Sequence, residues 1–425
     1  MALFRRVYIW MFIIVAVLGA SLTPFLEYFI NKPVDIPHLH VIYLLYVASS
    51  AVSYLFSYKK SLLFASQKTY VATVTSYWFT ISGAVLQILV LILWKNFLLY
   101  LTIQILNTII QDTVIAYKTD KLYPYLRATQ STKLPTDEVA SIKRNVKALI
   151  IYKVGTLSLN STDNIIISKF VGLLQVGFYS NYWLICTSVG GFLSTIFSNI
   201  TASIGNLNAT ESSARKVEMF YHLNMATFWF YGISSVCLYV CMSPFINLWV
   251  GQEYVLDDAT SFIIAFNQYI GGMLYSAYNY RQTMGLFVQG KMRPIISAIL
   301  NIVLSIIFAI YWGLPGVLWG TAITRLTTNV WFDPYIVFKR GLGLSVCPYL
   351  LDYLIKAAVF FLACFVCRII ASVIDNGTFM GLLLICGTSL LMSSLIFYVV
   401  FGRSKHTRYL LSIAQNSVSI LKNKQ

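Results

Sequence analysis

The sequence predicts an all-α polytopic membrane protein with about 12 transmembrane helices. Of its 425 residues, 58% are hydrophobic and only 11% are charged, which is too little charge to cover a water-soluble protein of this length. Apolar runs of about 18 to 25 residues recur along the whole chain, and each is long enough to cross the hydrocarbon core of a bilayer as a helix. Short polar segments that hold most of the basic residues separate these runs.

The apolar runs predict twelve spans in chain order. They cover residues 7–30, 38–57, 70–94, 97–116, 148–169, 173–200, 221–243, 259–279, 294–312, 315–337, 349–373 and 379–402. The first run lacks a small-residue cleavage site and is therefore predicted to be a span, not a removable signal. Gly316 and Gly320 in the tenth span have the small-xxx-small spacing that lets helices approach closely.

The distribution of basic residues predicts the orientation of the chain. With the N-terminus in the cytoplasm, 24 of the 31 Lys and Arg residues fall in cytoplasmic segments, as the positive-inside rule requires. The outer loops keep only Lys32, Lys95 and Lys169. Both termini are therefore predicted to be cytoplasmic. We attribute the net charge of +16 to this asymmetry and not to a nucleic-acid partner.

Two amphipathic segments lie outside the spans. The linker 117–147 separates four spans from eight, and aliphatic residues between 139 and 149 repeat at three- and four-residue steps, which predicts a short surface helix. The C-terminal residues 403–425 mix basic and aliphatic side chains. They predict an interfacial helix on the cytoplasmic side of the membrane.

Polar side chains interrupt the spans most densely between residues 147 and 206. At about 100° per residue, one arc of a helix roughly 100° wide contains Lys153, Thr156, Asn160, Asp163 and Asn164. An ionised side chain at bilayer depth costs at least ~2.5–3.5 kcal/mol. This arc is therefore expected to face protein or a water-filled cavity, not lipid.

Three further polar residues join the candidate site: Asn181 and Tyr182 in the sixth span, and Arg325 in the tenth. We interpret the polar groups within the spans as the lining of a transport pathway. The alternative is that they form interhelical hydrogen bonds that only hold the bundle together. Lys356 and Arg368 in the eleventh span are instead expected to extend their long side chains to the membrane interface.

The sequence contains no arrangement of residues typical of an enzyme. HExxH, GxSxG and GxxxxGK[ST] motifs are missing, and none of the four His residues has an acid at catalytic spacing. The seven Cys residues, including the CxxC of Cys364 and Cys367, lie mostly within apolar runs. We interpret them as small core residues, not as metal ligands or disulfides. No cofactor or metal is expected, although ion or proton coupling is compatible with the buried charges.

Several short stretches occur in the same order in a known family. They are YLFSYKKSLLFASQ at 54–67, LYPYL at 122–126, NSTDNIII at 160–167, VGFYSNYWLI at 176–185, TASIGN at 201–206, PFINLWVG at 244–251, NIVLSI at 301–306 and GVLWGT at 316–321. Through them the chain resembles the bacterial polysaccharide flippases, which translocate O-antigen and exopolysaccharide repeats. These flippases belong to the multidrug/oligosaccharidyl-lipid/polysaccharide exporter superfamily.

The resemblance implies two six-helix lobes around a central cavity, often followed by two extra helices. Residues 148–340 would then form the second lobe, 341–402 the extra pair, and 1–116 a first lobe with only four helices. On this comparison the first two helices of the family are missing. We expect either that the reading frame continues upstream or that this copy is a truncated relative. The missing pair would line the cavity opposite residues 148–200.

The resemblance also implies a function. The chain is expected to be a multi-pass protein of the bacterial cytoplasmic membrane. It would move an undecaprenyl-diphosphate-linked oligosaccharide from the inner to the outer leaflet by alternating access, for polysaccharide biosynthesis. Expected partners are the bilayer, the lipid-linked glycan, and the polymerase and glycosyltransferases of the same pathway, with no nucleic acid.

The candidate site residues have different expected roles in this transport. Lys153 is the first candidate for attracting the pyrophosphate or an acidic sugar, and Arg325 is the second. Asp163 would either balance Lys153 electrostatically or couple transport to an ion. The candidates for hydrogen bonds to sugar hydroxyls are Asn160, Asn164, Asn181 and Tyr182.

Two other functions stay open at this point. A membrane glycosyltransferase or polysaccharide polymerase would make a new glycosidic bond, which a flippase does not. A multidrug exporter of the same superfamily would confer resistance to cationic dyes, which a positively lined cavity should reject.

Overall fold

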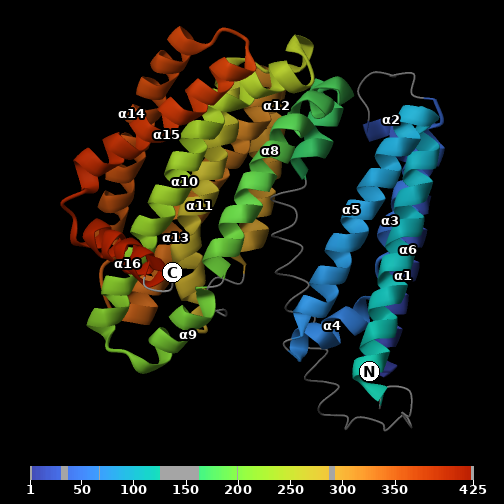
Figure 1. Cartoon of the computed structure of the whole chain (residues 1–425), viewed down its shortest axis with the longest axis horizontal. Coiled ribbons are helices and arrows are strands. Elements are labelled where there is room, and N and C mark those ends of the chain that lie inside the picture. The colour runs from blue at the N-terminus through green and yellow to red at the C-terminus, as the bar shows by residue number, and fades with distance from the viewer. Residues whose placement is uncertain are drawn as a thin grey trace. The chain divides into compact units, whose positions relative to one another are not determined.

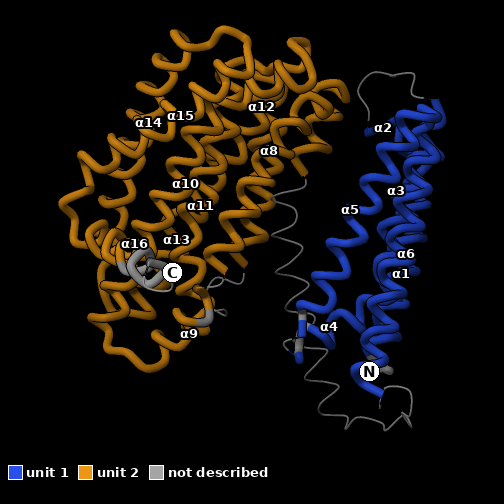
Figure 2. Tube along the Cα trace, viewed as in Figure 1, with its two compact units in different colours: residues 1–144 blue, residues 145–425 orange. Residues whose placement is uncertain are grey.

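The chain folds as an entirely helical protein in its described residues. The computed structural model describes residues 2–29, 37–66, 68–124, 162–198, 200–286 and 292–422, and every element in these ranges is helical. The chain divides into two compact units, residues 1–144 and 145–425 (Figure 2). Unit 1 and unit 2 each pack their helices around an interior of their own (Figure 1).

Unit 1 contains the first four predicted spans. In chain order its elements are α1 (Ala2–Ser21), η1 (Thr23–Phe25), α2 (Leu26–Phe29), α3 (Leu39–Val52), α4 (Ser57–Ala65), α5 (Thr69–Leu93) and α6 (Phe97–Leu122). Helix α6 packs on α3 and α5, and α1 packs on α3. Helix α3 corresponds to the second predicted span, 38–57, and α4 begins at the end of that span after a bend of 41°.

Two ion pairs, both at least partly buried, connect α4 to α6 at one end of unit 1. Asp112 of α6 has no exposed side-chain surface and pairs with Lys60 of α4. Further along α6, Asp120 pairs with Lys59 at 2.7 Å. Because an unpaired carboxylate is costly inside a protein, these lysines allow acidic residues to lie within the bundle.

Unit 2 contains the remaining spans. In chain order its elements are helical residues 162–166, the π-helical turn η3 (Ile167–Val171), α8 (Leu173–Ser198), α9 (Thr201–Thr210), α10 (Ser213–Trp249), η4 (Gln252–Tyr254), α11 (Asp258–Thr283), α12 (Arg293–Thr324), the π-helical turn η5 (Arg325–Asn329), α13 (Val330–Ile336), the π-helical turn η6 (Val337–Leu342), α14 (Cys347–Ile374), α15 (Phe379–Phe401) and α16 (Lys405–Lys422). Helix α16 confirms the helix predicted in the C-terminal tail. The predicted surface helix near residues 139–149 lies outside the described residues.

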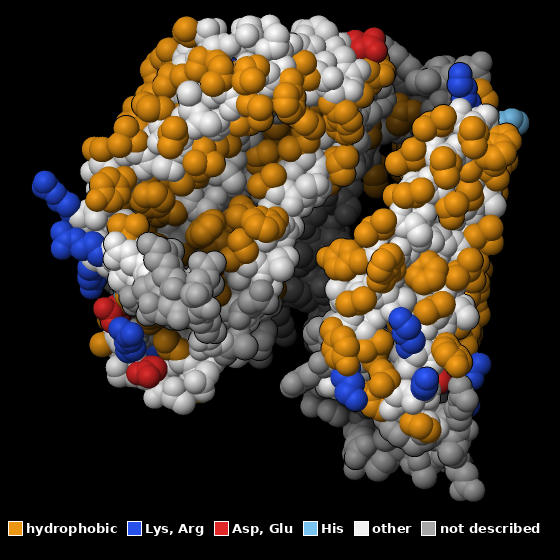
Figure 3. Space-filling model, in the orientation of Figure 1, with side chains coloured by type: hydrophobic (Ala, Val, Ile, Leu, Met, Phe, Trp, Pro, Cys, Tyr) orange, Lys and Arg blue, Asp and Glu red, His pale blue; other side chains and the backbone are white. Residues whose placement is uncertain are grey.

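Length and hydropathy confirm a polytopic membrane protein. Among the described residues, eight helices are long and apolar enough to cross a membrane, or nine if the bent pair α3 and α4 forms one span. On the face shown in Figure 3, hydrophobic side chains run along the helices of each unit and charged ones are few. Predicted span 148–169 lies largely outside the described residues. The ninth and tenth predicted spans fall within one apolar stretch, Arg293–Leu342.

Gly313 divides α12 into two antiparallel halves, where the sequence predicts the boundary between the ninth and tenth spans. Its φ of 63° and ψ of −135° are open only to glycine. Further along the second half, a Cβ atom on Gly316 would lie 2.1 Å from the Phe308 carbonyl oxygen, and one on Gly320 would lie 2.7 Å from the Ser305 nitrogen. The predicted close packing of these glycines is therefore confirmed.

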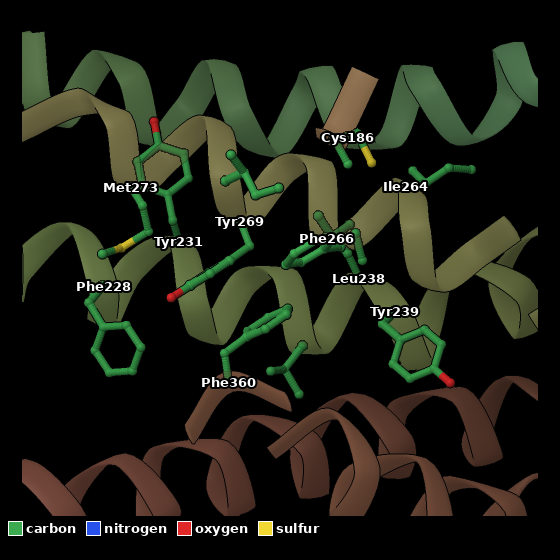
Figure 4. Packing of buried hydrophobic residues seen from close by; sticks show 14 of the residues in the cluster. Cys186, Phe228, Tyr231, Leu238, Tyr239, Ile264, Phe266, Tyr269, Met273 and Phe360 are labelled. Atoms are coloured by element: carbon green, nitrogen blue, oxygen red, sulfur yellow. The ribbon is translucent and has the colours of Figure 1, made fainter. Parts of the chain in front are cut away.

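Helix α11 lies at the centre of unit 2. It packs on α8, α10, α12 and α13, and because it faces protein on most sides it need not be as apolar as a lipid-facing helix. The rings of Tyr269 on α11 and Phe360 on α14 stack with their centroids 4.1 Å apart (Figure 4). Phe228 of α10 stacks on Phe397 of α15 at 4.4 Å. These aromatic contacts attach α14 and α15 to the central helices.

Lys356 corrects one sequence prediction. Its side chain does not extend to the membrane interface but is 1% exposed inside unit 2, where it pairs with Asp352 at 2.6 Å and donates to the side-chain oxygen of Asn224. A carboxylate and an amide from two helices replace water around the ammonium group. Arg368, by contrast, is 41% exposed and pairs with Asp258 at 2.9 Å.

Candidate functional site

A cavity of about 520 Å³ lies in unit 2, lined by residues of α8, α10, α11 and α12, by Asp163 ahead of η3 and by Arg325 at the start of η5. This volume is within the ~300–1,000 Å³ typical of small-molecule sites. We call it the unit 2 cavity. Its polar lining includes Asp163, Thr187, Ser194, Asn267, Gln268, Thr321 and Arg325.

Asp163 is held against the α12 hairpin on one side of the cavity. Its carboxylate is 8% exposed and accepts from the Thr321 hydroxyl, with oxygen–oxygen distances of 3.0 and 3.2 Å. Asn301 donates to the same hydroxyl oxygen at 2.9 Å and accepts from the Thr162 hydroxyl at 3.3 Å. The polar contacts across α12 therefore fix the position of the carboxylate.

Arg325 supplies the positive charge of the cavity. It begins the π-helical turn η5, and its Nη1 donates to the backbone oxygen of Asn267 at 2.9 Å. Gly271 lies beside the guanidinium, and a Cβ atom there would be in ordinary van der Waals contact with Nη1 at 3.6 Å. Among the described lining residues only Asp163 and Arg325 are charged, so their formal charges cancel.

Glycines and aromatic rings form the rest of the lining. Gly272 on α11 lies directly beneath the Tyr231 ring, since a Cβ atom there would be 2.0 Å from Cγ of that ring. On α8, the rings of Tyr179 and Trp183 have centroids 6.0 Å apart. A Cβ atom added to Gly191, on the same helix, would meet no described atom within 4 Å beyond its own helix, so Gly191 borders open space. The lining thus combines aromatic surface with small residues.

The structure brings together two of the seven residues that the sequence singles out. Asp163 and Arg325 both line the unit 2 cavity. Asn164 is exposed and lies outside the lining, because consecutive residues of a helix point about 100° apart. Lys153 and Asn160 lie outside the described residues.

Tyr182 and its neighbour Asn181 also lie outside the lining of the cavity. The Tyr182 side chain is completely buried, and its hydroxyl accepts from the Leu256 backbone N–H at 2.9 Å and lies 3.2 Å from the Ser243 hydroxyl. Tyr182 therefore connects α8 to α10 and to the segment before α11. This is the bundle-holding role that the sequence left as the alternative, and it leaves no ring surface for a sugar.

Sequence reasoning missed the amides of the cavity. Asn267 and Gln268 are consecutive polar residues in the middle of the eighth predicted span, which is the same signal that singled out Asn181 and Tyr182. Thr321 gave no such signal, because a threonine within a span commonly donates to its own helix. Its importance comes only from facing Asp163.

Comparison with solved structures identifies the fold. The chain is similar to a structure described as "Lipid II flippase MurJ, inward closed conformation", with a TM-score of 0.62 and 14% sequence identity, covering 94% of this chain and 83% of that chain. No protein-family model and no curated protein matches the sequence. The protein is thus a polytopic helical membrane protein whose fold is similar to that of this structure.

Proposed function

We propose that this protein is a flippase for an undecaprenyl-diphosphate-linked oligosaccharide in the bacterial cytoplasmic membrane. The unit 2 cavity carries the proposal: it places a carboxylate, a guanidinium and two amides inside a bundle of apolar helices. Buried polar groups of both signs are costly at membrane depth and are typical of a path for polar solutes. The fold shared with a lipid II flippase supports the same function.

Transport would proceed by alternating access. The lipid tail stays in the bilayer while the pyrophosphate and the sugars follow a polar path between the leaflets. Lys153 attracts the pyrophosphate, and Asn160 hydrogen-bonds sugar hydroxyls. Asp163 couples transport to an ion or a proton, since its carboxylate lies in the cavity among hydroxyl and amide groups. The glycosyltransferases and the polymerase of the pathway act before and after this step.

The test is surface polysaccharide export in bacterial cells that lack their own repeat-unit flippase. The wild-type chain should restore export, and both Lys153→Ala and Asp163→Asn should lower it at equal protein level. Lys121→Ala is the matched control, because Lys121 is an exposed basic residue at the end of α6. Unchanged export in Lys153→Ala would remove this residue from the site.

A sugar-transfer assay with the purified protein distinguishes the proposed flippase from a glycosyltransferase or polymerase. A flippase moves its lipid-linked substrate across a liposome membrane without changing the mass of the glycan. A longer glycan after incubation with the protein and a sugar donor would identify a transferase or a polymerase and would overturn the proposal.

A further inference from the structure

We infer that the unit 2 cavity is a subsite for an uncharged sugar ring of the transported saccharide and not for its diphosphate. The inference rests on the proposed function and names the part of the substrate that enters this cavity. It is carried by three properties of the lining: its charge balance, its hydrogen-bonding groups and its aromatic surface.

The charge balance of the cavity does not suit a diphosphate. Proteins bind phosphate groups with converging cations that keep their donors for the ligand. Here the guanidinium of Arg325 already donates to the Asn267 carbonyl at 2.9 Å. The Asp163 carboxylate lines the same cavity and repels an anion. Because Asp163 and Arg325 balance each other, the described part of the lining has no excess positive charge for a diphosphate and favours an uncharged ligand.

The hydrogen-bonding groups match a ring that carries several hydroxyls. The Thr187 hydroxyl donates to the Trp183 carbonyl at 2.8 Å, and the Ser194 hydroxyl donates to the Gly191 carbonyl at 2.9 Å. Each hydroxyl has thus committed its proton to its own helix and presents lone pairs to the cavity. The Gln268 amide adds both a donor and an acceptor. Sugar hydroxyls, which donate and accept, satisfy such a mixed lining.

One face of α8 supplies a platform for the ring. Trp183, Thr187, Gly191 and Ser194 recur at three- and four-residue steps and all line the cavity. Trp183 lines the cavity and the residue is 41% exposed, so it offers flat apolar surface to a ligand. The C–H face of a pyranose packs against such an indole while its equatorial hydroxyls reach the polar groups around it. Because Gly191 has no side chain, the surface of α8 beside Trp183 leaves room for the ring.

Filling the cavity tests the inference without disturbing the fold. A side chain added at Gly191 meets no described atom within 4 Å of its Cβ beyond its own helix, and Gly191 lines the cavity, so Gly191→Trp adds an indole there. Gly177→Trp is the matched control: Gly177 lies on the same helix, its Cβ position is equally open, and it does not line the cavity. Trp183→Ala removes the platform itself.

Saturation-transfer NMR on the full chain in nanodiscs measures the binding directly. The probes are the uncharged methyl glycosides of glucose, galactose and N-acetylglucosamine, together with inorganic pyrophosphate followed by ³¹P line broadening. We expect a glycoside signal that Gly177→Trp retains and that Gly191→Trp and Trp183→Ala lose. The inference is overturned if no glycoside gives a signal, if Gly191→Trp keeps it, or if pyrophosphate binding disappears in Gly191→Trp.

A liposome flipping assay distinguishes failure of this inference from failure of the proposed function. If glycoside binding depends on Gly191 but no lipid-linked saccharide is flipped, the proposed transport function is wrong and the sugar-binding site is supported. If the chain flips its substrate and Gly191→Trp does not slow the flipping, the transport function is supported and the sugar subsite is wrong.

Discussion

Replacing Asp333 with Asn is expected to destabilise unit 2 by about 3–5 kcal/mol, the cost of breaking a buried ion pair. Asp333 on α13 pairs with Arg281 of α11 at 2.6 Å and with Arg293 of α12 at 2.9 Å, and its side chain is 3% exposed. One carboxylate therefore holds three helices together. Asparagine keeps the volume of the side chain but removes the negative charge that pairs with both guanidiniums.

Thermal unfolding in detergent, followed with a thiol-reactive fluorophore, measures this effect through exposure of the buried cysteines. At about 2–4 °C per kcal/mol for a large domain, the midpoint should fall by about 6–20 °C. Arg368→Gln is the control, because it breaks an exposed ion pair with Asp258 and such pairs contribute only ~0–1 kcal/mol. If Asp333→Asn lowers the midpoint no more than this control, the assignment of Asp333 as a buried clamp is refuted.

Three further predictions concern other contacts of unit 2. Tyr182→Phe leaves a buried backbone N–H without its acceptor. The same thermal assay should therefore show that the free energy of unfolding falls by about 1–3 kcal/mol. An unchanged midpoint would contradict this. The thiols of Cys241 and Cys386 lie 3.1 Å apart, so a membrane-permeant oxidant should link them, and peptide mapping that finds only free thiols would show that α10 and α15 do not pack in this way. Burial and the neighbouring His222 lower the pKa of His406 to about 4, below the ordinary ~6.5. Helix α16, which carries His406, packs on α10. Between these pH values α16 binds a proton when it is detached from α10 but not when it is packed there, so this packing should weaken as the pH falls from about 7 to about 5. The protection of the α16 amides, corrected for the slower intrinsic exchange at lower pH, should therefore fall. His406→Gln should reduce the difference, and the part that remains is due to the neighbouring His222, which is also buried.

The positions of the helices followed from properties that each residue carries separately. The spans predicted at 349–373 and 379–402 correspond to α14 and α15 within a few residues, because the length of an apolar run is set by the thickness of the bilayer. The turn between the ninth and tenth spans was predictable for a similar reason. Glycine and proline at 313 and 315 end a helix through their own backbone preferences.

The candidate site was predictable only in part, as Asp163 and Asn164 show. Both are polar residues in one apolar run, and both fell within one arc of a regular helix. In the structure the first faces Thr321 and the second is exposed. Which side of a helix turns inward depends on the helices that pack around it, and a single run of sequence does not contain that information.

The sequence by itself determined the class of this protein, its helices and the presence of charges that need partners within the membrane. Tertiary structure alone decided those partners. Thr321 is 158 residues from Asp163, and Asn224 is 132 residues from Lys356. The free energy of a charge at bilayer depth requires that some partner exists, but the packing of distant helices determines which one it is.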